Sequence, residues 1–382
     1  SLSLSFYPTL PAMTSESVAD IPWCEEHSIR TRRVLQHVLP SDLSTVRLAV
    51  SCHLDAKMVM VFSALLKRGA ALYLCTCSPH TCRDFVVEHL VSLGAEQHAW
   101  FGMSEAERLE GVQLALKWKP THLCDMGGDL IVAAHAAHTP GILGAIEATA
   151  SGVVRVRPIS DTLPFPVWNW DEVPIKNGLH NRFMVGTTAV TAFYARTQLT
   201  FHGMEVAVAG YGMVGEGVAA AARSFGGSVT VVERDAARRM RAEYSGYRTA
   251  ASIEDVLPSS DVVITATGAK KVIDVSRHFP LLKQGGFLLN VGHSSAEIVV
   301  GDDVKRETVR PFVERLSKGE KHVYLLANGA PVNIAAGSGD SINAFDLTLA
   351  LLTVALAHVF SEQGTEGKGM ALLPEGVWRQ AL

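Results

Sequence analysis

Short apolar runs alternate with longer amphipathic runs from Arg47 onward. VRLAV precedes MVMVFSALLKRGA, and ALYLC precedes CRDFVVEHLVSLGA. Runs of the first kind are typical of buried strands, and runs of the second kind are typical of helices that cover a sheet. Their alternation predicts a parallel sheet with helices on its faces.

The alternation stops between residues 153 and 180, a stretch with four prolines and few helical periods. This composition predicts an ordered but irregular connection. A helix is then expected from Asn181 to about Leu199.

A second, tighter alternation begins at Glu205 with EVAVAG, a helix from about Met213, and SVTVVE, followed by the strand-like VVITATG and GGFLLNVGH. The chain becomes glycine-rich after about Gly329, and the apolar Leu347–Val359 segment predicts a last helix that returns to the first domain. We therefore expect an α/β fold of two Rossmann-like, doubly wound domains, the second inserted in the first. The expected divisions are 1–182, 183–334 and 335–382.

Composition narrows the class of protein. The chain of 382 residues suits two domains, and 48% hydrophobic with 19% charged residues excludes disorder. The formal net charge of −4 argues against nucleic acid as a partner. The apolar run from Phe345 to Phe360 is shorter than the roughly 20 residues of a membrane span and contains Asp346, so a buried helix or a subunit interface is expected instead.

The amino-terminal SLSLSFYPTLPAM has no features of a secretory signal, and six cysteines, all before residue 125, do not form a disulfide framework. Both observations favour the cytoplasm. Cys75, Cys77, His80 and Cys82 lie close together, but their spacing matches no standard zinc motif, so no metal is expected. His135 and His138 are likewise expected to pack rather than to bind a metal.

The strongest chemical signal is the glycine motif Gly210-Tyr-Gly212-Met213-Val214-Gly215, which directly follows a strand. Glycines at this spacing let a pyrophosphate approach the backbone amides at the start of the next helix. Glu233 follows about 20 residues later at the end of a strand, where a carboxylate accepts the ribose hydroxyls and repels a 2′-phosphate. The sequence therefore predicts a site for NAD rather than NADP.

Two later strands end in polar residues that would lie at the same edge of this sheet. Thr267 and Gly268 end VVITATG, while Asn290 and His293 end FLLNVGH. Ligands of parallel α/β sheets bind at that edge, which makes all four candidates for the cofactor site.

The sequence resembles the S-adenosylhomocysteine hydrolase family. The resemblance lies in NGLHNRFMVGTTAVTAFYARTQLTFHGMEVAVAGYGMVGEGVAAAARSFGGSVTVVERD, in ITATG and NVGH, and in the flanking SCHLDAKM, CDMGGDL, GAIEATASGV and NGAPVNIAAGSG. It covers roughly residues 45 to 360. It implies a substrate domain, an NAD domain and a hinge near Asn181, with NAD oxidising the 3′ carbon of a nucleoside, a 5′ elimination, and a final reduction of the ketone.

The resemblance also implies roles for individual residues. Lys176 and Asn181 match the groups beside the 3′-hydroxyl, and His53 matches the histidine near the 5′ leaving group. Asp125 and Asp129 belong to the DxGGD segment, and His293 matches the GH histidine. Three residues match positions that face NAD: Thr149, Ser151 and Asn333.

Four positions depart from the family pattern. Met126 replaces the second aspartate of DDGGD, and Ala148 replaces a glutamate that grips the sugar hydroxyls. His180 replaces an aspartate, and Asp340 replaces a histidine near the adenine. We expect Asp55, Met126 and Asp340 to contact the substrate and His180 to supply a replacement catalytic group.

Family members form tetramers whose C-terminal extensions reach a neighbour's NAD site. No such extension follows WRQAL, so we expect a homodimer, through the Leu347–Val359 helix, or a homotetramer.

Altered sugar contacts beside an intact NAD motif favour a divergent paralogue that acts on a different adenine nucleoside. The expected reaction is loss of water from the primary hydroxyl carbon, and in this the chain resembles the nucleoside dehydratase of the angustmycin antibiotic pathway. Three alternatives stay open. They are a hydrolase that gives adenosine and homocysteine, a non-catalytic NAD-binding regulator, and a dehydrogenase that releases NADH.

Overall fold

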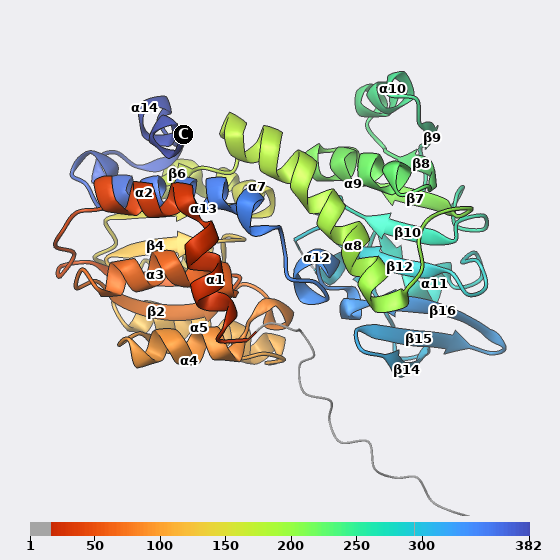
Figure 1. The fold of residues 1–382 in the computed structure, drawn as a ribbon, viewed down its shortest axis with the longest axis horizontal. Coiled ribbons are helices and arrows are strands. Elements are labelled where there is room, and N and C mark those ends of the chain that lie inside the picture. The colour runs from red at the N-terminus through yellow and green to blue at the C-terminus, as the bar shows by residue number, and fades with distance from the viewer. Residues whose placement is uncertain (1–16, 294) are drawn as a thin grey trace, which may run out of the picture.

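The computed structural model describes residues 17–293 and 295–382 and shows two α/β domains joined by two connections (Figure 1). The amino-terminal segment in which no secretory signal was found, residues 1–13, lies outside the described residues. The first domain contains a seven-stranded sheet in the order β17-β6-β5-β4-β1-β2-β3. All its strand pairs are parallel, as the alternating pattern predicts. The strands are β1 (Arg47–Cys52), β2 (Ala71–Thr76), β3 (Glu96–His98), β4 (His122–Asp125), β5 (Gly144–Glu147), β6 (Pro166–Asn169) and β17 (Gly369–Leu372).

Helices cover both faces of this sheet. Local signals fix some of their ends: Ser104 and Glu107 form a reciprocal capping box at the start of α5. The longer helices of this domain are α1 (Asp20–His27), α2 (Ile29–His37), α3 (Val59–Leu66), α4 (Asp84–Ser92), α5 (Glu105–Lys117), α6 (Asp129–Ala136), α7 (Ala150–Val156) and α13 (Ile342–Val359), and the short α14 (Glu375–Trp378) follows.

The second domain is built on an eight-stranded sheet in the order β14-β15-β16-β12-β10-β7-β8-β9. Its strands are β7 (Glu205–Ala209), β8 (Ser228–Val232), β9 (Arg248–Ala250), β10 (Val262–Thr265), β12 (Phe287–Asn290), β14 (Lys305–Arg310), β15 (Val313–Lys318) and β16 (Lys321–Leu326). A separate pair is formed by β11 (Ile273–Asp274) and β13 (Ile298–Val299). The helices are α8 (Val185–Thr197), α9 (Met213–Ser224), α10 (Ala236–Tyr244), α11 (Val275–His278) and α12 (Val332–Ala335). The insertion of one domain in the other is confirmed.

Two connections join the domains. The first is a π-helix, η4 (Lys176–Met184), which runs directly into α8. The second leads from α12 through residues 336–341 into α13. The expected division at 182/183 falls inside η4, and the one at 334/335 falls inside α12. π-Helical turns are rare and concentrate at functional sites, which draws attention to the first connection.

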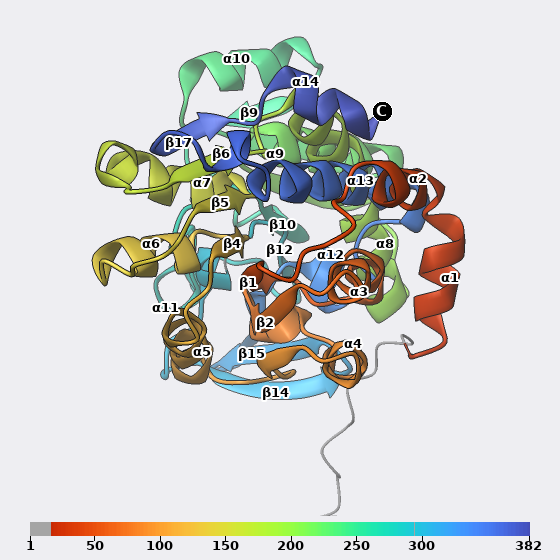
Figure 2. The same ribbon diagram turned by 90° about the vertical axis from the view of Figure 1, so that its left-hand side faces the viewer.

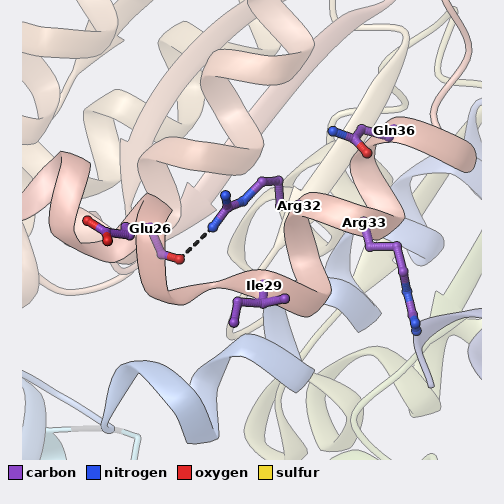
Figure 3. A pocket seen from close by; sticks show the side chains of 5 residues that line it. All are labelled: Glu26, Ile29, Arg32, Arg33 and Gln36. Atoms are coloured by element: carbon purple, nitrogen blue, oxygen red, sulfur yellow. Dashed lines mark hydrogen bonds between the residues drawn. The ribbon is translucent and has the colours of Figure 1, made fainter.

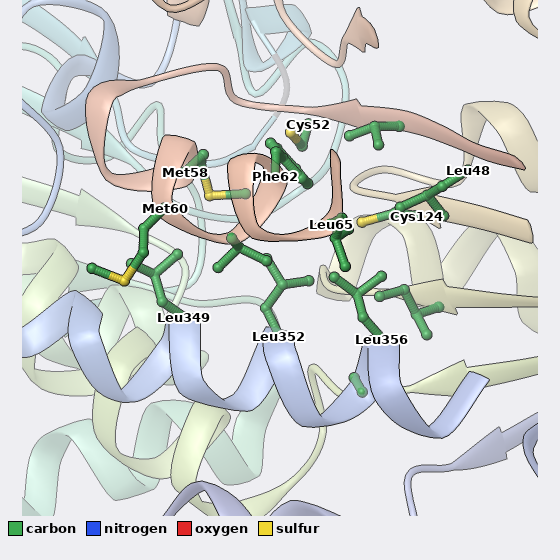
Figure 4. Packing of buried hydrophobic residues seen from close by; sticks show 14 of the residues in the cluster. Leu48, Cys52, Met58, Met60, Phe62, Leu65, Cys124, Leu349, Leu352 and Leu356 are labelled. Atoms are coloured by element: carbon green, nitrogen blue, oxygen red, sulfur yellow. The ribbon is translucent and has the colours of Figure 1, made fainter. Parts of the chain in front are cut away.

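The last long helix, α13, forms much of the core of the first domain. Leu349, Leu352 and Leu356 point toward α3 and its side chains Phe62 and Leu65 (Figure 4). The helix is long and apolar enough to cross a membrane, but 67% of it is buried inside the protein. The expectation of a buried helix is confirmed. The expected dimer through this helix stays a prediction.

Two parts of the fold differ from the sequence-based expectation. The connection predicted to be irregular contains α7 and β6, a strand that begins at Pro166 and pairs with β5 and β17. A proline normally argues against a strand in the middle of a sheet, which hid this one. The antiparallel β14–β15–β16 extension was also not expected. All six cysteines are free, and the described part of the chain holds no group of three or more side chains placed to bind a metal.

Candidate active site

The candidate site lies where the carboxyl ends of the two parallel sheets face each other. With the first domain toward the viewer, β10 and β12 stand behind β1 and β4 (Figure 2). His53 follows β1 and His293 follows β12, and their ring centroids are 5.5 Å apart. Two residues that the sequence predicted for the site, one from each domain, therefore lie close together across the domain interface.

His293 fits only because a glycine lies opposite it. A Cβ at Gly127 would come within 2.8 Å of Nε2 of His293, and the φ of Gly127 is +113°, a conformation that favours glycine. The DxGGD segment thus allows the NAD domain to approach the substrate domain closely.

A threonine fixes the tautomer of His53. The Thr81 hydroxyl donates to the carbonyl of Ser78 at 3.0 Å, and its oxygen lies 2.7 Å from Nδ1 of His53. When the single hydroxyl proton is donated to the Ser78 carbonyl, Nδ1–H is the donor to Thr81. Nε2 of His53 is left with a lone pair and can act as a base. Cys77 contacts the same ring, with Sγ 3.3 Å from Nδ1.

Burial favours the neutral form of both histidines. Burial, with a smaller effect of His293 and Lys176, lowers the pKa of His53 to about 3. Burial likewise lowers the pKa of His293 to about 4. A neutral imidazole accepts a proton and returns it, which is what proton transfer at a leaving group requires.

Lys176 lies in a polar triad at the start of η4. Its Nζ donates to Oδ1 of Asn181 at 2.8 Å and to Oδ1 of Asp171 at 3.2 Å, and Nδ2 of Asn181 donates to the same Asp171 oxygen at 3.2 Å. The side chain of Lys176 is 11% exposed. The two predicted residues are together, and Asp171, which sequence reasoning missed, holds both.

Asp125 and Glu147 are a fully buried carboxyl pair at facing positions of β4 and β5. Burial raises the pKa of Asp125 to about 7 and raises that of Glu147 as well, so the pair holds at least one proton near neutrality. Oδ1 of Asp125 and Oε2 of Glu147 have no hydrogen-bond partner among the described residues. The other Glu147 oxygen accepts the backbone amides of Gly127, Ala148 and Thr149.

Two other predicted carboxylates are committed to ion pairs. Asp129 lies 2.6 Å from Arg108 and 2.6 Å from Arg155. Asp55, predicted to contact substrate, accepts the amide of Lys57 and lies 3.1 Å from its Nζ. Met126 and Ala148 are buried and present apolar side chains where the family resemblance implies carboxylates.

The other two departures contact each other. Nε2 of His180 lies 2.8 Å from Oδ2 of Asp340, and both residues are 7% exposed. Nδ1 of His180 lies 2.9 Å from the Thr348 hydroxyl, and the Thr188 hydroxyl lies 2.8 Å from Oδ1 of Asp340. His180 and Asp340 are thus engaged with protein groups, whereas the sequence predicted a catalytic group at His180 and a substrate contact at Asp340.

The glycine loop has the shape that a pyrophosphate needs. A Cβ at Gly215 would lie 2.0 Å from the carbonyl oxygen of Gly210, and one at Gly210 would lie 2.6 Å from that of Ala266. No described atom lies within 4 Å of a Cβ built at Gly212. Two glycines therefore close the turn, and the third leaves open space at the start of α9, beside Met213 and Val214.

The flanking residues hold this loop in place. Glu233, at the end of β8, accepts the amides of Tyr211 and Asp235, each at 2.9 Å. Glu297, which sequence reasoning missed, accepts the amides of Thr267 and Gly268 at 3.0 and 2.7 Å.

Two asparagines at this edge differ. Asn290 bonds with Thr265, Gly292 and Gly329, so it shapes the loops. Oδ1 of Asn333 is buried and without a hydrogen-bond partner in the described part of the chain, and it suits a ligand amide. On the substrate side, Thr149 caps α7 and its hydroxyl oxygen lies 3.2 Å from Oγ of Ser151. The open cradle at Gly212, the placed Glu233 and the unpaired Asn333 oxygen fit NAD.

The missed residues share a cause. Asp171 and Glu297 act through hydrogen bonds to residues 5 to 30 positions away, and no short motif marks them. Thr81 stands in the CSPHTC segment, where sequence reasoning assigned no role to Thr81 itself. A surface hollow of about 490 Å3 on α1 and α2, lined by Glu26, Ile29, Arg32, Arg33 and Gln36, includes no predicted site residue (Figure 3).

Known proteins match both the cofactor domain and the whole chain. Residues 181–339 match the family described as S-adenosyl-L-homocysteine hydrolase, NAD binding domain. An adenosylhomocysteinase of Archaeoglobus fulgidus is 31% identical over 94% of this chain and 91% of its own. S-inosyl-L-homocysteine hydrolases of Methanococcus maripaludis and Methanopyrus kandleri are 29% and 30% identical, over 90% and 96% of this chain and 84% and 89% of theirs.

These relatives extend over both domains, and the glycine loop keeps the geometry of an NAD site. The chain therefore belongs to the S-adenosyl-L-homocysteine hydrolase family, and its cofactor is NAD.

Proposed function

We propose that this family member is a redox-neutral nucleoside dehydratase that removes water from an adenine nucleoside with a free primary hydroxyl. The observation that carries the proposal is a contrast within one site. The Lys176–Asn181–Asp171 triad and the two facing histidines are in place, while Met126 and Ala148 remove carboxylates from the sugar-facing wall.

The glycine loop would hold NAD, which would supply a reversible hydride acceptor for the 3′ carbon. Lys176, held by Asp171 and Asn181, hydrogen-bonds the 3′ oxygen and exchanges its proton during this oxidation and reduction. A ketone at the 3′ carbon makes the neighbouring C4′ proton acidic enough to be removed. The 5′ oxygen then leaves, and the 4′,5′ double bond forms.

His53 is the group that we assign to the leaving oxygen. Its Nε2 lone pair accepts the C4′ proton and then delivers it to the departing hydroxide, so that water is released. The atoms balance, because the nucleoside loses one water and the hydride removed at the start returns at the end. No net NADH forms.

The apolar wall fits a changed sugar. Carboxylates that bind ordinary ribose hydroxyls are expensive to bury without partners, and Met126 and Ala148 avoid that cost if the substrate lacks those hydroxyls in the usual places. A psicofuranosyl adenine, whose anomeric carbon carries an extra hydroxymethyl group, is the substrate that we propose to test first.

Hydrolysis is the second candidate, because the relatives are named for hydrolysis of S-adenosyl- or S-inosyl-L-homocysteine. The experiment is mass spectrometry of products after NAD-loaded protein is incubated with S-adenosylhomocysteine or with nucleosides that carry a free primary hydroxyl. We expect a nucleoside lighter by one water and no accumulated NADH. Free homocysteine would instead establish a hydrolase, and accumulated NADH would establish a dehydrogenase.

Bound NAD without any product would favour the regulatory alternative. A His53→Gln variant serves as the matched control, because it removes the base but keeps the size of a polar side chain. Dehydration should stop in this variant, while NADH formed in the first step remains visible at the protein-bound cofactor.

A further inference from the structure

The two connections between the domains meet at one buried polar contact. His180 lies in the middle of η4, the first connection, and Asp340 lies at the end of the second, just before α13. The 2.8 Å contact between them joins parts of the chain 160 residues apart. The elements that must bend when the domains open or close are therefore tied together directly.

Both side chains are saturated by this contact and its neighbours. The two nitrogens of His180 lie beside Asp340 and Thr348, and the two oxygens of Asp340 lie beside His180 and Thr188. Thr348 belongs to α13 of the substrate domain, and Thr188 belongs to α8 of the NAD domain. A buried polar group is stable only when it is paired in this way.

Further cations hold the second connection in place. Nζ of Lys57 donates to the carbonyl of Ser338 at 2.6 Å, and Nη2 of Arg83 donates to that of Gly337 at 3.3 Å. Nε of Arg196, on α8, donates to the carbonyl of Ala336 at 2.6 Å. The segment that carries Asp340 is thus fixed on both sides, so Asp340 is a rigid anchor for His180.

The anchor acts on the site through the chain itself. Asn181 follows His180 directly, and its Oδ1 receives the hydrogen bond from Lys176 at 2.8 Å. If His180 were free to turn, the π-helical turn that presents Asn181 and Lys176 would lose its buried anchor. By the family resemblance, the residues expected at positions 180 and 340 are aspartate and histidine, so the chain holds the same two residue types in exchanged places.

We propose that His180 and Asp340 form a clasp between the two connections and act as positioning residues for Asn181 and Lys176. Both positions depart from the family pattern, and in this chain their side chains pair with each other. The clasp depends on the proposed function only for the reaction that reports its effect.

The test is a reciprocal exchange in the NAD-loaded full chain. The variants are His180→Asp, Asp340→His, the double variant His180→Asp/Asp340→His, and Arg379→Gln, which removes an exposed ion pair on α14 as the matched control. Each single variant buries two like groups, and we expect its unfolding temperature to fall by about 5–10 °C. The double variant should recover most of that loss, while the control should stay close to the unchanged protein.

A second readout separates positioning from stability alone. We measure the rate of NAD reduction on mixing with saturating nucleoside, per folded molecule, at a temperature where all variants are folded. Single variants should lose about tenfold or more of this rate, with NAD affinity unchanged, and the double variant should regain it.

Three outcomes overturn the clasp or part of it. If the double variant is no more stable than the worse single variant, the two residues are not a pair. If the unfolding temperature falls but the rate per folded molecule is unchanged, the pair is structural and does not position Asn181 and Lys176. If NAD is never reduced by any nucleoside, the proposed function fails, and the unfolding temperatures still decide on the pair.

Discussion

The cofactor half and the substrate half of the site have diverged to different degrees. Around NAD, the glycine turn, Glu233 and the open space at Gly212 retain the geometry that a dinucleotide needs. Around the sugar, Met126 and Ala148 stand where the family resemblance implies carboxylates, whereas Lys176 contacts Asp171 and Asn181. This contrast is the basis of the proposal that the redox step is kept and that its substrate has changed.

The largest expected effect comes from removing the ammonium group of Lys176. Lys176→Met should lower turnover about 1000-fold or more, because no other described side chain replaces the ammonium between Asp171 and Asn181. Product formation is measured by mass spectrometry, with the exposed Lys305→Met as control. Turnover in Lys176→Met within tenfold of the unchanged protein would remove Lys176 from the mechanism.

The cofactor half can be tested by two glycines that differ in what surrounds them. Gly212→Ala should fold normally but bind NAD at least about tenfold more weakly, because the methyl group enters the open space where the pyrophosphate approaches. Gly215→Ala should lower the stability of the cofactor-free protein, because its Cβ would lie 2.0 Å from the Gly210 oxygen. NAD titration and thermal unfolding distinguish the two. Equal behaviour of the two variants would show that the open space is not the pyrophosphate site.

A smaller effect is expected at Thr81, which serves the substrate half. Thr81→Val removes the acceptor for Nδ1–H of His53, and we expect kcat to fall about tenfold, the equivalent of about 1.4 kcal/mol. Thr81→Ser keeps the hydroxyl and should stay within about twofold. If Thr81→Ser were as slow as Thr81→Val, the methyl group rather than the tautomer would be responsible.

The smallest expected effect concerns the contact between His53 and His293, where the two domains meet. The pKa values of His53 and His293, about 3 and 4, lie below the ordinary value because the closed domains bury both rings. When the domains separate, water restores the rings toward a pKa near 6.5, so the open form binds more protons below that pH. The closed form therefore has its full advantage above about pH 7 and loses it as the pH falls toward 4.

Small-angle scattering of the substrate-free protein should show expansion between pH 7.5 and pH 5, and His293→Gln should show less. A radius independent of pH in the unchanged protein would contradict the idea. The charged groups that face these rings are Lys176, Arg83 and Asp340 at His53, and Asp129, Lys176, Arg108 and Arg155 at His293.

Sequence reasoning succeeded where the signal is local. The Gly210–Gly215 turn, its strand and helix, and Glu233 lie within about 30 residues and are found where expected. It was weaker where the signal depends on distant parts of the chain. β6 exists because β17 joins it from more than 190 residues away, and the contact between His180 and Asp340 is invisible until the chain is folded. The roles of Asp55 and Asp340 at a substrate stay predictions.

The position of α13 also sets the order in which the molecule can be completed. The core of the first domain needs Leu349, Leu352 and Leu356, which follow the whole second domain in the chain. During synthesis the cofactor domain has all its strands by Leu326 and can fold as a unit, while the first domain waits with an uncovered apolar groove. The domain that begins the chain is therefore the last to be finished, and until α13 emerges its exposed groove is the part of the nascent protein most open to aggregation.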